Sequence, residues 1–189
     1  MEKTAIFQYP VIDIIQKRWS PVLFDGKTIS EQQANTLVEA AMWAPSAYNE
    51  QPWRYIVAHK GSEKFDKILA ALIEFNHAWA KEASLLVVSL AKKIYSHDGK
   101  PNYHYMYDTG AANAFMINQA TSMGIFSHSM GGIYYDKMRE LFAIPEELEI
   151  CSVIAFGYHS EASGANEQLL QREQQPRMRK AMKDVVLHK

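Results

Sequence analysis

The stretch that most constrains this 189-residue chain is residues 44–58, which read APSAYNEQPWRYIVA. Apolar residues at spacings of three and four predict a helix that enters the stretch. Pro45 ends this helix, because its ring clashes with helical neighbours and its nitrogen cannot donate a hydrogen bond. Residues 46–51 then form a polar turn, and residues 53–58 are an apolar run typical of a buried strand. The stretch therefore predicts short polar side chains held between two packed elements.

Such an elbow is open to two interpretations from its residues alone. A few well-aimed polar groups in an apolar cleft can fix the orientation of a polar heterocycle. Turns rich in Pro, Ser, Asn and Gln are also common as simple connections that satisfy their own backbone. Motifs elsewhere in the chain are needed to distinguish a binding elbow from an ordinary connection.

Composition excludes several classes of protein. The length suits one domain, which we place at residues 1–189, and the net charge of −1 gives no basic footprint for nucleic acid. Cys151 is the only cysteine, so no internal disulfide is possible, and its apolar surroundings favour a packing role over a nucleophilic one. No signal pattern, no apolar run that could span a bilayer and no metal-ligand spacing is present, so we expect a cytoplasmic protein without a metal site or membrane partner.

The N-terminal part contains a candidate anion site. Residues 9–18 read as a short helix that leads into Arg18-Trp19-Ser20. A guanidinium and a hydroxyl two residues apart can share one phosphate group. The alternative is a capped helix end with a solvated arginine.

The remaining pattern predicts alternating helices and strands. A capping box at Ser30 and Gln33 opens the helix before the elbow, and Asp108 is expected to cap a long helix that ends at residue 123. Residues 127–133 read as a glycine loop and residues 160–173 as a polar surface excursion. The other predicted helices are 63–75 and 134–142, and the other predicted strands are 84–90, 150–156 and 185–187.

Two segments suggest contacts beyond a simple core. The helix over 108–123 is apolar nearly all round, which predicts burial on several sides and a dimer interface as well as a core. Residues 92–107 form an irregular segment that contains Tyr103, His104 and Tyr105. These side chains could form a lid over a bound substrate, or they could be packing or dimer contacts.

Five separated motifs resemble those of the nitroreductase family of FMN-dependent oxidoreductases. They are the elbow A-P-S-x-x-N-x-Q-P-W, the Arg18-Trp19-Ser20 segment, the D-x-G-x-A start of the helix at Asp108, the Met130-Gly131-Gly132 loop and the closing R-x-R at Arg177 and Arg179. The resemblance implies an α+β fold with a mostly antiparallel central sheet flanked by helices. It also implies an intertwined homodimer with C-terminal strand exchange and two FMN sites at the interface.

The resemblance also implies which residues hold the cofactor. Arg18, Ser20, Arg177 and Arg179 would bind the phosphate and ribityl chain, and a backbone N–H of the glycine loop would face the flavin N5. Asn76 would bond the flavin, although a helix C-cap is the alternative for this asparagine. The candidate cofactor-binding residues are Arg18, Trp19, Ser20, Asn76, Met130, Gly131, Gly132, Arg177 and Arg179 from one subunit, Pro45, Ser46 and Asn49 from the other, and Gln51 of the same elbow.

By the resemblance, the activity would be ping-pong hydride transfer from NADH or NADPH through flavin N5 to a nitroaromatic, a quinone or a related small acceptor. No protein side chain would act as catalytic acid, base or nucleophile. The alternatives are a flavin-binding or redox-sensing protein without steady turnover, or a flavin dehalogenase or dehydrogenase on the same scaffold. Three positions depart from the family pattern: Val22 replaces a basic residue that reaches the flavin pyrimidine edge, Gly131 an acidic residue, and Ala181 a proline.

Overall fold

The structure is a computed structural model that describes residues 3, 5, 7–161 and 167–188. In the described chain a four-stranded sheet has the order β1-β2-β4-β3, and every neighbouring pair is antiparallel. The strands are β1 (Trp53–His59), β2 (Leu85–Lys92), β3 (Phe126–Met130) and β4 (Leu148–Gly157). Strand β3 pairs only with β4, so one of its edges carries no strand.

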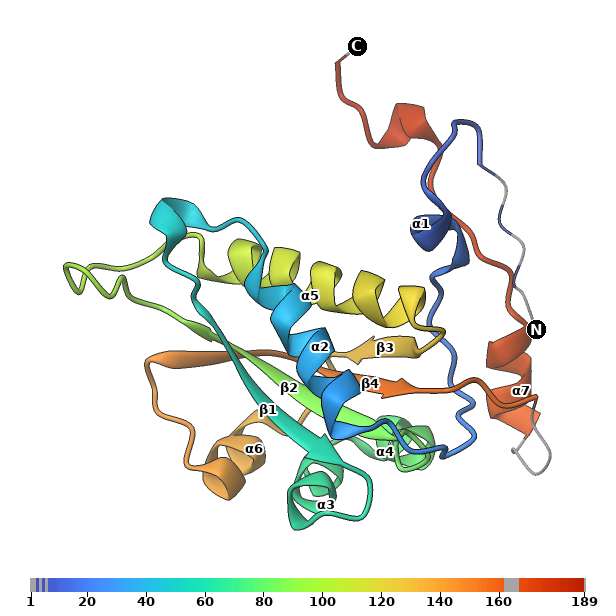
Figure 1. Cartoon of the computed structure of the whole chain (residues 1–189), viewed down its shortest axis with the longest axis horizontal. Coiled ribbons are helices and arrows are strands. Elements are labelled where there is room, and N and C mark those ends of the chain that lie inside the picture. Colours follow the sequence, from blue (N-terminus) through green and yellow to red (C-terminus); the bar gives the residue numbers. More distant parts are fainter. Residues whose placement is uncertain (1–2, 4, 6, 162–166, 189) are drawn as a thin grey trace.

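Helices cover both faces of this sheet (Figure 1). Helices α2 (Glu31–Met42) and α5 (Tyr105–Ser122) lie on one face. Helices α3 (Glu63–Ala70), α4 (Glu74–Ala80) and α6 (Tyr135–Phe142) lie on the other. The expected α+β fold with an antiparallel sheet between helices is confirmed.

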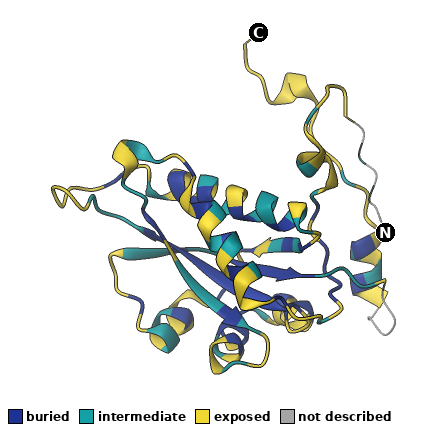
Figure 2. Cartoon of the chain, viewed as in Figure 1, coloured by how far each residue is buried: buried dark blue, intermediate teal, exposed yellow. Residues whose placement is uncertain are grey.

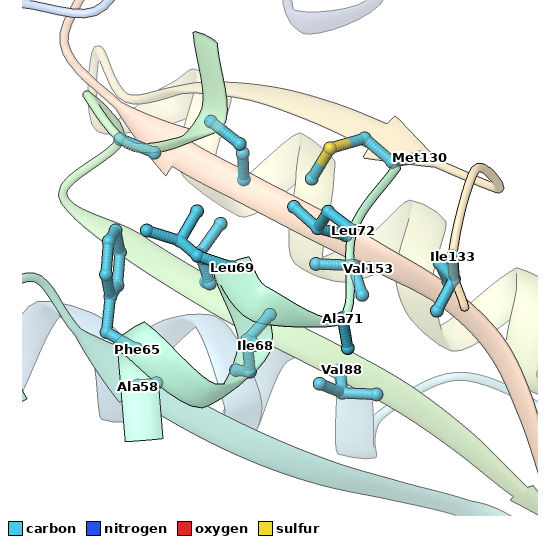
Figure 3. Packing of buried hydrophobic residues seen from close by; sticks show 14 of the residues in the cluster. Ala58, Phe65, Ile68, Leu69, Ala71, Leu72, Val88, Met130, Ile133 and Val153 are labelled. Carbon is cyan, nitrogen blue, oxygen red and sulfur yellow. The ribbon is translucent and has the colours of Figure 1, made fainter. Parts of the chain in front are cut away.

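The central strand β2 supplies both cores with alternate side chains. Leu85 and Val87 pack under α2 and α5, whereas Leu86 and Val88 face the opposite layer. All four are buried, which explains why the sequence shows a continuous apolar run there instead of an alternating one. Figure 3 shows the core between the sheet and the layer of α3, α4 and α6. In this core Phe65, Ile68, Leu69 and Leu72 lie against Val88 and Val153.

The remaining elements lie at the ends of the chain and at the elbow. They are α1 (Asp13–Lys17), the 3-10 turn η1 (Ala47–Asn49), α7 (Glu167–Gln174) and the 3-10 turn η2 (Met182–Asp184). Figure 1 shows the C-terminal tail and α1 side by side, with the tail extending away from the sheet. Helix α7 lies where a polar surface excursion was expected, and it buries Leu169 and Glu173.

The capping box at Ser30 is confirmed. The Ser30 hydroxyl accepts the N–H of Gln33 at 3.2 Å, and the Gln33 side chain accepts the N–H of Ser30 at 2.9 Å. Helix α2 nevertheless ends at Met42, three residues before Pro45. Helix α1 begins only at Asp13, so the N-terminal helix is shorter than expected.

Two helix predictions were wrong. The expected helix over 63–75 is two helices, because the backbone between them turns to bond the segment after β3. Ala71 accepts from the N–H of Tyr134 at 2.8 Å, and Ile73 donates to the carbonyl of Gly132 at 3.2 Å. Asp108 does not cap α5, which begins at Tyr105; its carboxylate accepts the N–H of Ala47 in the elbow at 3.0 Å.

The chain also differs from the prediction at two strands. Residues 127–130 of the expected glycine loop belong to β3, which pairs with β4 from Phe126↔Gly157 to Met130↔Val153. Residues 185–187 form no strand within the described chain, where they follow η2 and are exposed. Their expected partner sheet belongs to a second subunit, so strand exchange stays a prediction.

Helix α5 leaves an apolar face uncovered. Its buried side carries Ala112, Met116 and Ala120, whereas Phe115 and Tyr107 are exposed (Figure 2). Within the described residues, no helix combines the length and the apolar character needed to cross a bilayer.

Removing the α2 cap should destabilise the fold measurably. We expect Ser30→Ala to lower the free energy of unfolding by about 1 kcal/mol, because the Gln33 N–H loses its acceptor. Urea unfolding followed by circular dichroism measures this. Thr28→Ala, at an exposed position just upstream, is the control, and an equal effect of both variants would contradict the assigned cap.

Candidate functional site

Arg18 and Ser20 open onto a pocket beside the free edge of β3. Arg18 Nη1 donates to Ser20 Oγ at 3.2 Å. The pocket has a volume of about 270 Å³, and it is lined by Arg18, Ser20, Ala114, Ile117, Asn118 and residues 127–129. A guanidinium and a hydroxyl thus line one cavity, and their joint binding of a phosphate stays a prediction.

Three arginines from the two ends of the chain gather near this pocket. Burial, and then the positive charges of Arg177 and Arg179, lower the pKa of Arg18. Burial and the charge of Arg179 also lower the pKa of Arg177. Guanidinium groups stay protonated in proteins, so this corner of the molecule concentrates positive charge that an anion would relieve.

The C-terminal arginines are placed by helix α1. Arg177 Nη1 donates to the carbonyl of Gln16, and its Nη2 donates to the carbonyl of Ile15 at 3.4 Å. These carbonyls belong to the last turn of α1, where helix acceptors lack intrahelical partners. Arg179 is exposed and donates only to its neighbouring Met178 carbonyl, at 2.7 Å, among the bonds of the described chain.

The segment after Arg18 is locked into the protein. The Trp19 side chain is buried, with its ring edge-on to Phe126 and His159 at centroid distances of 5.6 and 5.2 Å. It lines a second pocket of about 360 Å³, at the last turn of α5, and not the pocket of Arg18. The Val22 N–H donates to Glu173 Oε2 at 2.8 Å, and the Val22 side chain lies in the core.

Asn76 and the loop after β3 form the adjoining part of the site. Asn76 Nδ2 donates to the carbonyl of Gly132 at 3.1 Å, and the N–H of Ile73 donates to the same oxygen. Asn76 is buried inside α4 and is not a helix C-cap. The Met130 side chain is buried in the core, so only its backbone remains for a ligand, while Gly131 is exposed.

The elbow is the second cluster of predicted residues. Pro45 and Asn49 are exposed. Two hydrogen bonds hold the turn: Ser46 Oγ accepts the N–H of Gln51 at 3.0 Å, and the Gln51 side-chain amide donates to the carbonyl of Asn49. Asn49 and Gln51 have φ angles of 55° and 52°, a left-handed conformation that costs free energy outside glycine. Strain of this kind, held by surrounding bonds, is typical of functional segments.

The elbow and the arginine pocket do not meet within one chain. Asp108, in the first turn of α5, bonds the elbow, whereas Ile117 and Asn118, near the other end, line the pocket. The residues of α5 that line the pocket, Ala114, Ile117 and Asn118, follow Asp108 by six to ten residues, roughly 9–15 Å along the helix at 1.5 Å per residue. Tyr103, His104 and Tyr105 lie at the elbow end of α5, so the candidate substrate residues are also remote from Arg18 (Figure 1).

Other chemistry finds little support in the described chain. No group of three or more His, Cys, Asp and Glu is placed to hold a metal ion there. Burial, followed by the charge of Glu149, raises the pKa of the Cys151 thiol to about 12. A thiol with so high a pKa is a poor nucleophile at neutral pH.

A family model described as the nitroreductase family matches this chain over residues 15–85 and 74–158. The chain belongs to the nitroreductase family. Its fold resembles a solved structure described as an oxidoreductase containing FMN, with a TM-score of 0.92 and 37% identity over 97% of this chain and 94% of the other.

Two curated relatives carry names of the same kind. A protein of Archaeoglobus fulgidus, provisionally named NADH dehydrogenase/NAD(P)H nitroreductase, is 28% identical over 78% of this chain and 84% of its own length. The oxygen-insensitive NADPH nitroreductase of Helicobacter acinonychis is 31% identical over 62% of this chain and 56% of its own.

Sequence reasoning missed the residues that hold the Arg18 segment in place. Glu173 of α7 bonds Val22, and His128 Nδ1 lies 2.8 Å from the carbonyl of Pro21. These contacts join positions more than 100 residues apart, so no local motif reports them. The spacing of Leu169 and Glu173, one helical turn apart, was the available signal that α7 buries one face.

The two glycines after β3 should differ sharply in their tolerance of alanine. A Cβ at Gly132 would lie 2.5 Å from Ile73 Cδ1 and 2.7 Å from Asn76 Nδ2, whereas a Cβ at Gly131 meets nothing within 4 Å. We expect Gly132→Ala to lower the free energy of unfolding by about 1–3 kcal/mol. Gly131→Ala is the matched control, expected within about 0.5 kcal/mol of the wild type in urea unfolding. Equal stability of the two variants would show that the loop is not clamped by α4.

Proposed function

We propose that this protein is an FMN-dependent NAD(P)H oxidoreductase that works as a homodimer. The observation that carries the proposal is the pocket that Arg18 and Ser20 line beside β3, with the positive charges of Arg177 and Arg179 acting on Arg18. The relatives support it, since one structure at 37% identity contains FMN and several curated proteins are named NAD(P)H nitroreductases or oxidoreductases.

The residues present fit the parts of FMN. A phosphate is a dianion; Arg18 and the Ser20 hydroxyl offer donors in the pocket, and the nearby charges of Arg177 and Arg179 would add to its attraction for an anion. The flat ring needs close backbone approach, and Gly131 has open space at its Cα. Arg18, Ser20, Asn76, the Met130–Gly132 backbone, Arg177 and Arg179 make up this half of the proposed site, whereas the Trp19 side chain is left out of it because it lines the other pocket.

The second half of the site would come from another copy of the chain. The elbow residues Pro45, Ser46, Asn49 and Gln51 lie beside the first turn of α5 and do not line the pocket of Arg18, so in this proposal a second chain places them on the cofactor. The exposed Phe115 and Tyr107 of α5 offer an apolar surface between the two ends. A second copy packed there, in the opposite direction, would bring its elbow to the first copy's arginine pocket.

When bound, FMN supplies the redox chemistry, taking a hydride from NADH or NADPH at N5 and passing it to a small acceptor such as a quinone or nitroaromatic. The chain's own part is to hold and orient. Asn76 and Ile73 fix the Gly132 carbonyl and thereby set the direction of the neighbouring backbone N–H groups. In each copy, Tyr103, His104 and Tyr105 lie at the elbow end of α5. The copy that lends its elbow to the site would therefore also bring these three side chains to the border of the acceptor position.

Removing one cation of the clamp should weaken FMN binding. We expect Arg179→Ala to cost about 2–3 kcal/mol of binding free energy, the scale of a charge-assisted hydrogen bond. Fluorescence titration of apoprotein with FMN measures this. Arg139→Ala, which removes a cation paired with Glu149 on the α6 side, is the control.

A turnover assay on the same protein preparation distinguishes an enzyme from a protein that only binds flavin. We expect steady oxidation of NADH or NADPH when a quinone is added to the FMN-loaded protein. FMN binding without turnover would favour a flavin-binding or redox-sensing role. A wild-type protein that binds no FMN would contradict the proposed function.

A further inference from the structure

The elbow holds three residues in an unfavourable backbone conformation. Tyr48, Asn49 and Gln51 have φ angles of 53°, 55° and 52°. The left-handed region disfavours residues that carry a Cβ, so each of the three raises the free energy of this segment. Glu50 lies among them with an ordinary φ of −65°. A segment with such angles persists only where its surroundings hold it in place.

Glu50 supplies one of these holds through a side chain that is 5% exposed. Its Oε1 accepts both the N–H and the hydroxyl of Ser96, at 2.9 and 2.6 Å, and Lys92 Nζ donates to the same hydroxyl oxygen at 2.9 Å. Burial alone would raise the pKa of the Glu50 carboxyl, but the hydrogen bonds from Ser96 and the charges of Lys92 and His97 outweigh it and lower the pKa. An ionised carboxylate, which accepts stronger hydrogen bonds than a neutral group, therefore ties the elbow to Ser96.

This tie ends in a hairpin, residues 94–101, that is itself fixed to the fold. A bridge between Ile94 and Pro101 closes the hairpin. At its base the N–H of Lys93 donates to the carbonyl of Glu147 at 2.9 Å, just before β4. The hairpin therefore gives the elbow a fixed point of attachment.

Aromatic contacts make a second tie between the same two segments. The Tyr48 ring lies edge-on to Tyr95 at a centroid distance of 5.9 Å, and its centroid is 6.2 Å from that of His97. The Tyr95 and His97 rings are themselves 5.2 Å apart. Both ties run from the hairpin to the strained part of the elbow.

Other hydrogen bonds hold the ends of the elbow. Asp108 accepts the N–H of Ala47 at 3.0 Å, and Arg54 Nη1 donates to the carbonyl of Gln51 at 3.0 Å. Between these two points, Glu50 is the residue whose side chain hydrogen bonds to another segment of the described chain. The middle of the elbow thus depends on the carboxylate of Glu50.

We propose that Glu50 is a positioning residue that keeps the elbow in the strained form in which it contacts FMN bound to a second copy. The inference rests on the proposed function, in which Ser46 and Asn49 reach that cofactor. An elbow held in its binding conformation needs no further ordering, whereas a released elbow binds only in the fraction of molecules that adopts this form. Loss of the Glu50 carboxylate should therefore lower the affinity for FMN without removing a group that touches it.

The test places Glu50→Ala on one subunit or the other of a mixed dimer. One subunit carries Arg18→Ala with Arg179→Ala, so the single tight FMN site combines the other subunit's pocket with the elbow of the substituted subunit. We expect Glu50→Ala on the subunit with the arginine substitutions to raise the FMN dissociation constant about tenfold. On the other subunit it should leave this constant unchanged, because that elbow serves the disabled pocket.

The remaining outcomes are distinguishable. Equal weakening in both arrangements, or weakening in neither, would overturn the role of Glu50. The reverse pattern would show that each chain uses its own elbow, and it would contradict the shared site of the proposed function. Failure of the wild type to bind FMN would also contradict the proposed function.

A conservative variant separates the tie from the charge. Glu50→Gln keeps an oxygen for both Ser96 donors, so in an ordinary dimer it should bind FMN within about twofold of the wild type. Weakening as large as that of Glu50→Ala would overturn the proposal. Glu146→Ala, which removes an exposed carboxylate between α6 and β4, is the control and should leave FMN binding unchanged.

Discussion

Strand β2 has no face turned to solvent, and this constraint organises the molecule. Its side chains alternate between two cores, so each face of the sheet needs its own layer of helices. Helices α2 and α5 supply one layer, and α3, α4 and α6 supply the other. The sheet can then offer ligands only its edges and ends, and the free edge of β3 is where Arg18, Ser20 and the glycine loop gather.

Helix α5 acts as a spacer between two incomplete sets of polar groups. At its first turn Asp108 holds the strained elbow, and near its other end it walls the arginine pocket. The helix separates these sets along one chain and exposes Tyr107 and Phe115 between them. The proposed second copy would pack on this surface and complete the proposed site.

The sequence predicted those parts of the fold that local patterns determine. The Ser30 capping box, β1 and the apolar run of β2 follow from side-chain chemistry within a few residues. Strand β3 was missed because Ser127, His128 and Ser129 carry no strand pattern, and only pairing with β4 extends them. Asp108 was misassigned because its partner, the Ala47 N–H, lies 61 residues away.

The candidate site was partly visible for the same reason. Arg18 and Ser20 are neighbours in sequence, and their contact in the structure follows from that spacing. The support that Glu173 gives to this segment was invisible, since its bond to the Val22 N–H joins positions 151 residues apart. The role of residues 185–187 depends on a second chain, which no pattern within one chain can place.

The proposed sharing of one FMN site between two copies is tested most directly with mixed dimers. One subunit would carry Arg18→Ala with Arg179→Ala, the other Ser46→Ala with Asn49→Ala, each with its own affinity tag, and FMN bound by the purified mixed dimer would be titrated. The account predicts that each parent dimer binds FMN weakly, whereas the mixed dimer regains one tight site of the two. A mixed dimer as weak as its parents would show that one chain builds the whole site.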